Sequence, residues 1–280
     1  MATLSNIEIL PEDCVSTILS YTCPPEACRF SLVSSTFQSA ANSDIVWQKF
    51  LPSDYEDIVS SAIHPLNFST KKHLFCALCR PLLIDGGNKS FQLDKFSGKK
   101  SYVLSSRELL ITWSNDPMLW SWRPVPESRF PVAAELRTVS WLEIIGKIRT
   151  GILTENTLYG AYLIIKVSHR AYGLDSAASK VSVEVGNRVQ SGRAYVCHKD
   201  ENRQKMESLL YGNRIEMMGM GDRGNQRVPS KRDDGWMEIE LGEFFSGEAD
   251  EEVKMSLMEV GYQLKGGLIV EGIEVRPKLV

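Results

Sequence analysis

The sequence predicts an α+β chain of two domains, in which a small N-terminal helical bundle precedes an antiparallel β-sandwich of the jelly-roll type. The chain has 280 residues and domains average roughly 150 residues, so two domains are expected. Before Gly87 the apolar residues recur at helical spacing, whereas short segments of alternating polarity follow it. The sequence has no βαβ pattern and no glycine-rich phosphate loop, which argues against a nucleotide-dependent enzyme.

Composition and charge narrow the function classes further. Apolar residues make up 43% and charged residues 24% of the chain, which is typical of a folded protein with a sizeable core. The net charge of -3 argues against a general nucleic-acid binder. No Lys or Arg precedes Arg29 and no apolar run approaches the roughly 20 residues that span a bilayer, so we expect neither a secretory signal nor a membrane segment. The six cysteines are then expected to be reduced, in a cytoplasmic and/or nuclear protein.

Three short helices are predicted in the first fifty residues. Residues 10–13 (Leu-Pro-Glu-Asp) are typical of a helix start, because proline fits the first turn and acidic side chains interact favourably with the helix dipole. Pro24 and Pro25 end this pattern, and a second helix is expected to begin at Glu26. Residues 44–51 form a third short apolar segment. So small a bundle is weakly stable alone, which suggests that a partner completes its core.

Residues 53–87 are predicted to be a helical connector that ends in a domain boundary at Gly87. Cys76 and Cys79 form a single CxxC motif in this connector. A zinc site needs four ligands in a rigid arrangement and a redox pair needs a thioredoxin-like setting, and neither is evident. We therefore interpret both cysteines as small buried thiols that pack within a helix, and we expect no metal and no cofactor. The helical patterns of the connector lie near residues 57–63 and 71–78.

After Gly87 the chain is predicted to form strands joined by turns, which favours antiparallel pairing. Gly272 lies inside the last strand and indicates a bulge or a close backbone approach. Residues 212–235 instead predict a long mobile loop with solvated basic side chains, and an anion or partner site is the alternative. These basic residues are Arg223, Arg227, Lys231 and Arg232. The predicted strands are 108–113, 139–148, 157–167, 181–185, 236–241, 253–260 and 268–275.

Two parts of the chain resemble known families. Residues 10–15, 31–37 and 47–52 together resemble an F-box. Residues 89–277 resemble the plant phloem protein 2 lectin domain, which is related to the tobacco lectin Nictaba. The matching blocks include RELLITW at 107–113, RFP at 129–131, AEL at 134–136, VSWLEI at 139–144, DGWMEI at 234–239 and GIEVRP at 272–277. The resemblance implies an F-box at 1–52, a helical connector at 53–87 and a phloem protein 2-like β-sandwich lectin domain at 88–280.

The F-box resemblance implies the substrate-recognition subunit of a Skp–cullin–F-box ubiquitin ligase, which is a non-catalytic role. In such complexes the F-box binds the Skp-type adaptor, and through it the cullin, while the C-terminal domain captures a protein or glycoprotein target for ubiquitination. An apolar helical unit with few charges also suits a partner's groove. Leu19 and Leu32 are equally compatible with the bundle's own core. The implied adaptor contacts are Leu10, Pro11, Ile18, Leu19, Leu32 and Val33.

The lectin resemblance implies a site for N-acetylglucosamine oligomers formed by Trp113, Trp120, Glu252 and Glu259. The two indoles flank a predicted turn at 114–119, and aromatic rings with carboxylates suit the faces and hydroxyls of sugars. The two glutamates differ by an odd number, so a regular strand directs them to opposite faces, and they converge only across a bulge or beyond the strand end. The alternative is that Trp113 ends a core strand and Glu259 makes a structural hydrogen bond.

The remaining tryptophans of this region, Trp122, Trp141 and Trp236, are predicted to be core residues. The alternative function for the whole chain is an intracellular lectin for N-acetylglucosamine oligomers without a ligase role. An intrinsic enzyme is not expected, because the four histidines are scattered and none lies near a nucleophile motif. Nucleic acid and membrane are not among the expected partners.

Overall fold

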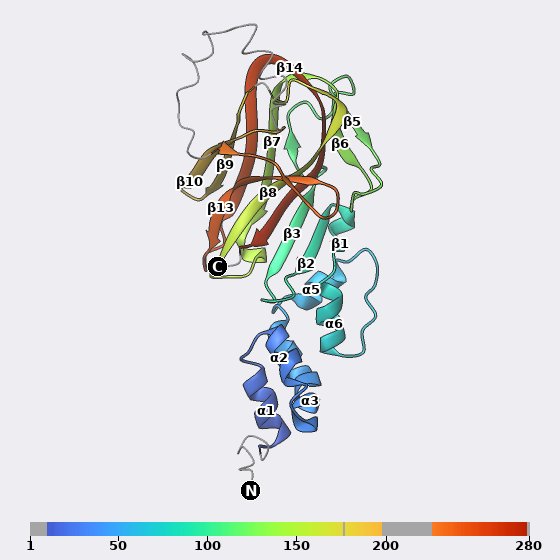
Figure 1. The fold of residues 1–280 in the computed structure, drawn as a ribbon, viewed down its shortest axis with the longest axis vertical. Coiled ribbons are helices and arrows are strands. Elements are labelled where there is room, and N and C mark those ends of the chain that lie inside the picture. Colours follow the sequence, from blue (N-terminus) through green and yellow to red (C-terminus); the bar gives the residue numbers. More distant parts are fainter. Residues whose placement is uncertain (1–9, 176, 198–225, 279–280) are drawn as a thin grey trace. The chain divides into compact units, whose positions relative to one another are not determined.

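The protein is described from a computed structural model, which describes residues 10–175, 177–197 and 226–278. The chain divides into two compact units, Met1–Tyr102 and Val103–Val280. Figure 1 shows that the first unit is mainly helical and that the second is built from strands. The prediction of an N-terminal helical part followed by an antiparallel β domain is therefore confirmed.

Side-chain caps begin several of the short helices in the first unit. Ser34, Ser43 and Thr70 each accept a hydrogen bond from a backbone N–H in the first turn of the helix that follows. Trp47 is 1% exposed in the core, where its indole N–H donates to the Ala41 carbonyl at 2.7 Å. None of the described helices is long and apolar enough to cross a membrane. The helices are α1 (Glu12–Leu19), α2 (Pro24–Phe30), α3 (Ser35–Asn42), α4 (Asp44–Phe50), α5 (Tyr55–Ser60) and α6 (Lys71–Leu78).

Four helices, α1 to α4, lie where the sequence predicted three. The apolar residues Leu32, Val33 and Phe37 follow α2 at helical spacing, but a turn separates the first two from the third. The Val33 N–H closes this turn by donating to the Phe30 carbonyl at 3.0 Å, and the Ser34 cap then starts α3. Periodicity alone does not reveal such an interruption, because the residues of a single turn keep the same spacing.

A hairpin of β1 (Leu82–Ile84) and β2 (Lys89–Leu93) belongs to the first unit. The hairpin is attached to the helical part of that unit, since the Ile63 N–H donates to the Leu83 carbonyl at 3.0 Å. The glycine turn predicted as a domain boundary is thus the loop of this hairpin. The compact units divide after Tyr102, and the domain bounds 1–52, 53–87 and 88–280 stay a prediction.

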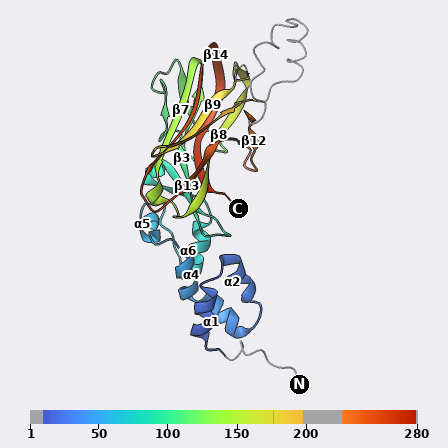
Figure 2. The ribbon, with the colours of Figure 1, turned by 90° about the vertical axis from the view of Figure 1, so that its left-hand side faces the viewer.

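The second unit is a sandwich of two sheets that share the last strand (Figure 2). The β8 sheet has the strand order β3–β14–β8–β13–β12, with β6 and β5 attached along β14. The β9 sheet has the order β4–β7–β14–β9–β10–β11. The strands are β3 (Lys100–Ser105), β4 (Leu110–Ile111), β5 (Trp120–Arg123), β6 (Ala133–Leu136), β7 (Val139–Arg149), β8 (Thr157–Tyr172), β9 (Ser179–Val185), β10 (Arg188–Ala194), β11 (Gln226–Arg227), β12 (Ser230–Lys231), β13 (Met237–Ser246) and β14 (Glu252–Pro277).

β14 is a single strand where the sequence predicted two. Its first part pairs with β7 and β9, and its second part pairs with β8, so that it passes from one sheet to the other (Figure 1). The pairing is irregular between Val260 and Leu268, where the strand changes sheets, and a bulge follows between Val270 and Gly272. The predicted close approach at Gly272 is confirmed, because a Cβ there would lie 2.0 Å from the Leu104 carbonyl oxygen.

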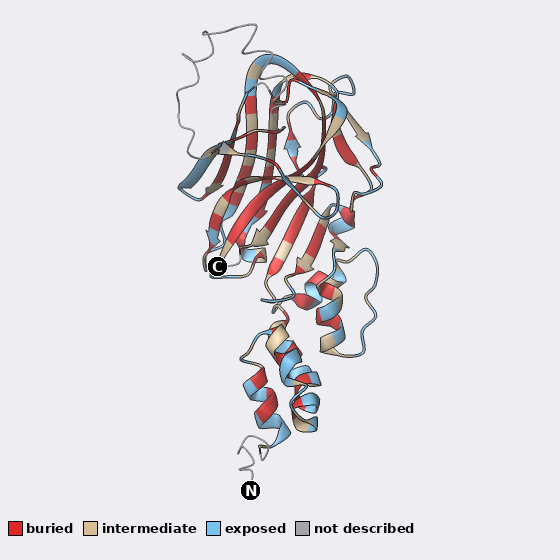
Figure 3. Ribbon diagram, in the orientation of Figure 1, coloured by how far each residue is buried: buried red, intermediate tan, exposed pale blue. Residues whose placement is uncertain are grey.

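The core lies between the two sheets and is formed by alternate side chains of their strands (Figure 3). On β7, Leu142, Ile144 and Ile148 are buried on one face of the strand. Gly146 allows the sheets to approach, since a Cβ there would lie 2.8 Å from Cδ1 of Ile273 on β14. The strand period therefore places these three side chains on one face of β7, and the opposite sheet buries that face.

Residues 226–235 are not the solvated loop that the sequence predicted. A guanidinium N–H of Arg227 donates to a backbone carbonyl of β13 at 2.7 Å. Arg232 pairs with Glu238 at 2.6 Å and with Glu274 at 2.5 Å, so its charge is held in a network on the β8 sheet. Lys231 is exposed in β12, and Arg223, with the rest of 212–225, lies outside the described residues.

Candidate functional site

Apolar side chains are exposed near the end of α1 and in the turn after α2. Ile18 is 53% exposed, Leu32 is 87% exposed and Val33 is 59% exposed. Leu19, by contrast, is 1% exposed and fills the helical core. The structure thus separates the two leucines that the sequence left open, because Leu32 lies on the surface. Exposed apolar side chains that gather on one small unit are typical of a protein-binding surface.

The start of α1 and three further side chains extend this apolar exposure. Leu10 is half-buried and Pro11 is exposed where α1 begins. Tyr21 is 79% exposed, Ile45 57% and Phe30 37%, and none of these three was among the predicted contacts. They lie at helix ends, where the spacing of apolar residues does not distinguish a core residue from a surface residue.

In the second unit, Trp113 lies in a tight loop after β4, with a φ of 60° and an exposed fraction of 49%. A positive φ is costly for a bulky residue, so the surrounding structure must impose it. Two other indoles do so: Trp120 donates its N–H to the Thr112 carbonyl and Trp122 donates to the Ser114 carbonyl, each at 3.1 Å. The peptide group before Trp113 and the one after Ser114 are thereby held, and the Trp113 ring is half-exposed to solvent.

Trp113 contacts Trp141 on β7, with the ring centroids 6.4 Å apart and the planes at 73°. Trp141 is 42% exposed, so the prediction that it is a core residue is wrong. It lies opposite Val260 of β14, which is 59% exposed, and Leu110 of β4 is 60% exposed on the same side of the β9 sheet. We refer to Trp113, Trp141, Val260 and Leu110 as the aromatic face.

One carboxylate belongs to this aromatic face. Glu143 follows Trp141 by two residues on β7, so the strand period places both side chains on the outer side. The Thr112 hydroxyl donates to Oε2 of Glu143 at 3.1 Å, and the Thr112 N–H donates to the Glu143 carbonyl at 3.1 Å. Two tilted rings beside a held carboxylate offer an apolar surface with a directed hydrogen-bond acceptor. That combination suits a sugar ring or an apolar side chain of a protein.

Family models match both units of the chain. The model for phloem protein 2 matches residues 99–277, and the F-box domain model matches residues 7–49. The chain is an F-box protein of the phloem protein 2 family. It is 51% identical over 279 residues to F-box protein PP2-B15 of Arabidopsis thaliana, covering 96% of both chains. It is also 51% identical to F-box protein VBF of the same plant, covering 96% of this chain and 99% of that one.

These comparisons indicate no catalytic enzyme family, and F-box proteins are typically non-catalytic adaptors. Among solved structures, the Podospora anserina GH26-CBM35 β-(1,4)-mannanase shows a TM-score of 0.33 at 8% identity, covering 64% of this chain and 28% of that chain. A likeness that weak supports no conclusion about ligands.

The phloem protein 2 domain does not bring the four predicted sugar contacts together. Trp120 is 1% exposed, so it positions Trp113 from below the surface. β14 is regular from Glu252 to Glu259, and the odd separation directs the two side chains to opposite faces: Glu252 is exposed and Glu259 is 7% exposed. Glu252 lies opposite Arg149, eight positions along β7 from Trp141, which is about 26 Å at the usual rise per residue. Sugar binding by these four residues stays a prediction.

Glu259 has a structural partner inside the phloem protein 2 domain. Its Oε1 lies 3.1 Å from Nζ of Lys265, whose side chain is fully buried. The Lys265 ammonium also donates to the carbonyls of Ser140 at 2.6 Å and Gln263 at 2.9 Å. Burial lowers the pKa of Lys265 below its ordinary value. The buried pair fixes the segment in which β14 changes sheets, and it is the structural hydrogen bond that the sequence left as the alternative.

The CxxC motif of the first unit is not a pair of buried thiols. α6 forms where a helix was predicted, but Cys76 is exposed and only Cys79 is half-buried. Burial, together with the neighbouring Cys76, raises the pKa of Cys79 to about 12, which keeps this thiol protonated at neutral pH. The six cysteines are unpaired. Within the described part of the chain, no group of three or more His, Cys, Asp and Glu side chains is placed to hold a metal ion.

Proposed function

We propose that this F-box protein is the substrate-recognition subunit of a Skp–cullin–F-box ubiquitin ligase in the cytoplasm and/or nucleus. Its F-box binds the Skp-type adaptor, and through it the cullin, while the phloem protein 2 domain captures a protein or glycoprotein target for ubiquitination. The observation that carries this proposal is the exposure of Ile18, Leu32 and Val33 on the F-box. An adaptor groove would remove this apolar surface from water. Leu10 and Pro11 begin the same contact, and Leu19 supports it from the core.

The proposed adaptor contact is tested by the double variant Leu32→Asp and Val33→Asp. Both side chains are largely exposed, so folding should change by no more than about 0.5 kcal/mol for each substitution. Burying a leucine at an interface contributes roughly 1.5–3 kcal/mol. Binding to a Skp-type adaptor should therefore weaken at least about tenfold. Val228→Asp is the matched control, because Val228 is 53% exposed in the phloem protein 2 domain. The proposal would be contradicted if the unsubstituted protein, the double variant and the control variant all co-purified with the adaptor to the same extent.

A second candidate function is an intracellular lectin for N-acetylglucosamine oligomers without a ligase role, and the aromatic face favours it. In this proposal Trp113 and Trp141 contact the sugar rings, Glu143 accepts a hydroxyl hydrogen bond, and Trp120 holds Trp113 in place. Calorimetric titration with chitotriose tests it: Trp113→Ala and Trp141→Ala should abolish binding. Phe68→Ala is the control, because Phe68 is a 41% exposed aromatic residue of the first unit. An intact protein that binds no member of a glycan array would leave protein recognition as the role of this face.

A further inference from the structure

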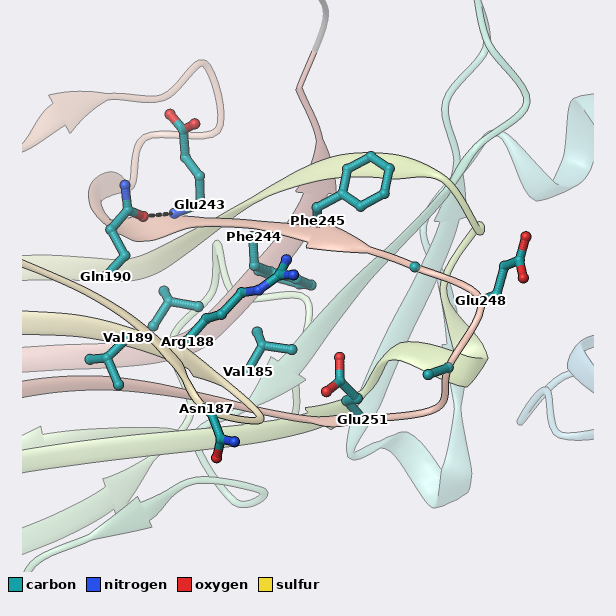
Figure 4. A pocket seen from close by; sticks show the side chains of 13 residues that line it. Val185, Asn187, Arg188, Val189, Gln190, Glu243, Phe244, Phe245, Glu248 and Glu251 are labelled. Carbon is teal, nitrogen blue, oxygen red and sulfur yellow. Dashed lines mark hydrogen bonds between the residues drawn. The ribbon is translucent and has the colours of Figure 1, made fainter.

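A pocket at the open side of the phloem protein 2 sandwich is separate from both surfaces described above (Figure 4). It lies between β10 and β13 and has a volume of about 580 Å³, within the ordinary range for ligand sites. Val183 and Val185 of β9 and Phe244 of β13 form a buried apolar floor. Arg188 and Glu251 extend beside this floor in Figure 4. The pocket is thus apolar inside and charged at its rim.

The first half of β13 is protected along the edge that faces away from β8. β12 pairs with Met237 and Glu238 there. The Arg227 guanidinium then donates to the Leu241 carbonyl at 2.7 Å. The Glu243 N–H donates to Oε1 of Gln190 at 2.6 Å, across the gap to β10. The backbone groups on this edge of β13 are therefore hydrogen-bonded as far as Glu243, by β12 and by the side chains of Arg227 and Gln190. Beyond Glu243, no described strand pairs with β13 on this side.

The next free position on this edge is Phe245. Because the Glu243 N–H points to the open side, the backbone N–H and C=O of Phe245, two residues on, point there as well. The opposite strand agrees: Leu158, the partner of Phe245, accepts a hydrogen bond from the Lys278 N–H at 2.9 Å, on the side away from β13. A backbone donor and acceptor thus face the pocket in strand geometry. Edge groups of this kind are templates for an added strand.

The charges at the rim favour a basic ligand. One basic residue, Arg188, and three acidic residues, Glu243, Glu248 and Glu251, line the pocket. Glu243 is paired with Lys278, whereas Glu248 and Glu251 make no ion pair with any residue that the structure describes. Two exposed carboxylates therefore lie beside a free backbone edge and an apolar floor.

We propose that this pocket binds an extended basic peptide segment, which adds to β13 as a further strand. The inference rests on the proposed function, since the segment belongs to a protein target captured by this domain. The segment's backbone pairs with Phe245, and its alternate side chains point either over Val185 and Phe244 or outward. A Lys or Arg of the segment reaches Glu248 and Glu251. One face of the Phe244 ring stacks on Tyr159 with centroids 5.8 Å apart and an angle of 18°, so that face is not available to a sugar.

The test uses the full chain and a fluorescein-labelled octapeptide of alternating Val and Lys with blocked termini, followed by fluorescence anisotropy. We expect saturable binding, and at least about tenfold weaker binding when Glu replaces Lys in the peptide. A series of peptides, each N-methylated at one residue, tests the strand pairing without altering the protein. Methylation should weaken binding about tenfold at the position whose N–H donates to the Phe245 carbonyl, while its two neighbours, whose N–H groups point away from β13, tolerate it. No binding of the Val-Lys peptide, or equal binding across the methylated series, would overturn the proposal.

Charge variants of the protein complete the test. Glu251→Lys should weaken the Val-Lys peptide at least about tenfold, and Glu108→Lys, an exposed site outside the pocket, should not. Chitotriose that competes with the peptide would also overturn the assignment, because it would make the pocket a sugar site. Adaptor co-purification is measured on the same preparations. A protein that co-purifies with the adaptor but does not bind the peptide would contradict only the proposed peptide site. A protein that binds the peptide but does not co-purify with the adaptor would contradict only the proposed ligase role.

Discussion

Trp113 and Trp120 were predicted as equal partners in a sugar site, but the structure gives them opposite energetic roles. Trp120 is 1% exposed and donates its indole N–H to the Thr112 carbonyl, whereas Trp113 is 49% exposed with a positive φ. Replacing each by alanine should therefore have very different effects on the free energy of unfolding. This contrast tests whether Trp120 positions the loop or contacts a ligand.

The magnitudes follow from burial and backbone conformation. Trp120→Ala should lower the free energy of unfolding by about 3–5 kcal/mol, as large-to-small changes in a core do. Trp120→Phe keeps most of the ring but removes the hydrogen bond to Thr112, which should cost about 1 kcal/mol. Trp113→Gly loses the edge contact with Trp141, roughly 0.5–1.5 kcal/mol. It also relieves the left-handed backbone strain, roughly 1–2 kcal/mol, so its net effect should lie within about 1 kcal/mol of zero.

The assay is urea unfolding followed by far-UV circular dichroism, because tryptophan fluorescence changes with the substitutions themselves. The slope of each transition must stay constant for the comparison to hold. Trp113→Gly should lose ligand binding although its free energy of unfolding is close to that of the unsubstituted protein. Trp120→Phe should weaken ligand binding, because the loop that carries Trp113 is then held less firmly. Equal stability of Trp120→Ala and Trp113→Ala would refute the assignment of Trp120 to the core.

Two further predictions concern the sandwich itself. Burial raises the pKa of Glu238, but hydrogen bonds and ion pairs with Arg276 and Arg232 outweigh it and leave that pKa below its ordinary value of 4.5. A carboxyl group whose pKa is lowered by folding stabilises the fold at pH values above its pKa in the unfolded chain. The free energy of unfolding should therefore fall as the pH drops below about 4.5, and it should fall less steeply in Glu238→Gln. Gly272→Ala should cost more than about 2 kcal/mol, because its Cβ meets the Leu104 carbonyl. Gly247→Ala, with open space around the added Cβ, should be near neutral.

The sequence was sufficient for features that depend on neighbouring residues along one strand or helix. The alternation on β7 placed Trp141 and Glu143 on one side and Leu142 and Ile144 on the other, as observed. It did not say that the side with Trp141 faces solvent, and so Trp141 was assigned to the core. The period of a strand determines which residues share a face, but the covering of that face depends on the other elements that pack there.

The chain by itself determined its family, its helical and β parts, and the opposed directions of Glu252 and Glu259, because each depends on local pattern or ordered motifs. Only the tertiary structure decided that β14 serves both sheets and that Lys265 holds Glu259 inside. It alone brought Trp141 to Trp113 and left Phe245 on an open edge. These features join segments far apart in sequence, and their distances follow from how the two sheets pack, which no local spacing encodes.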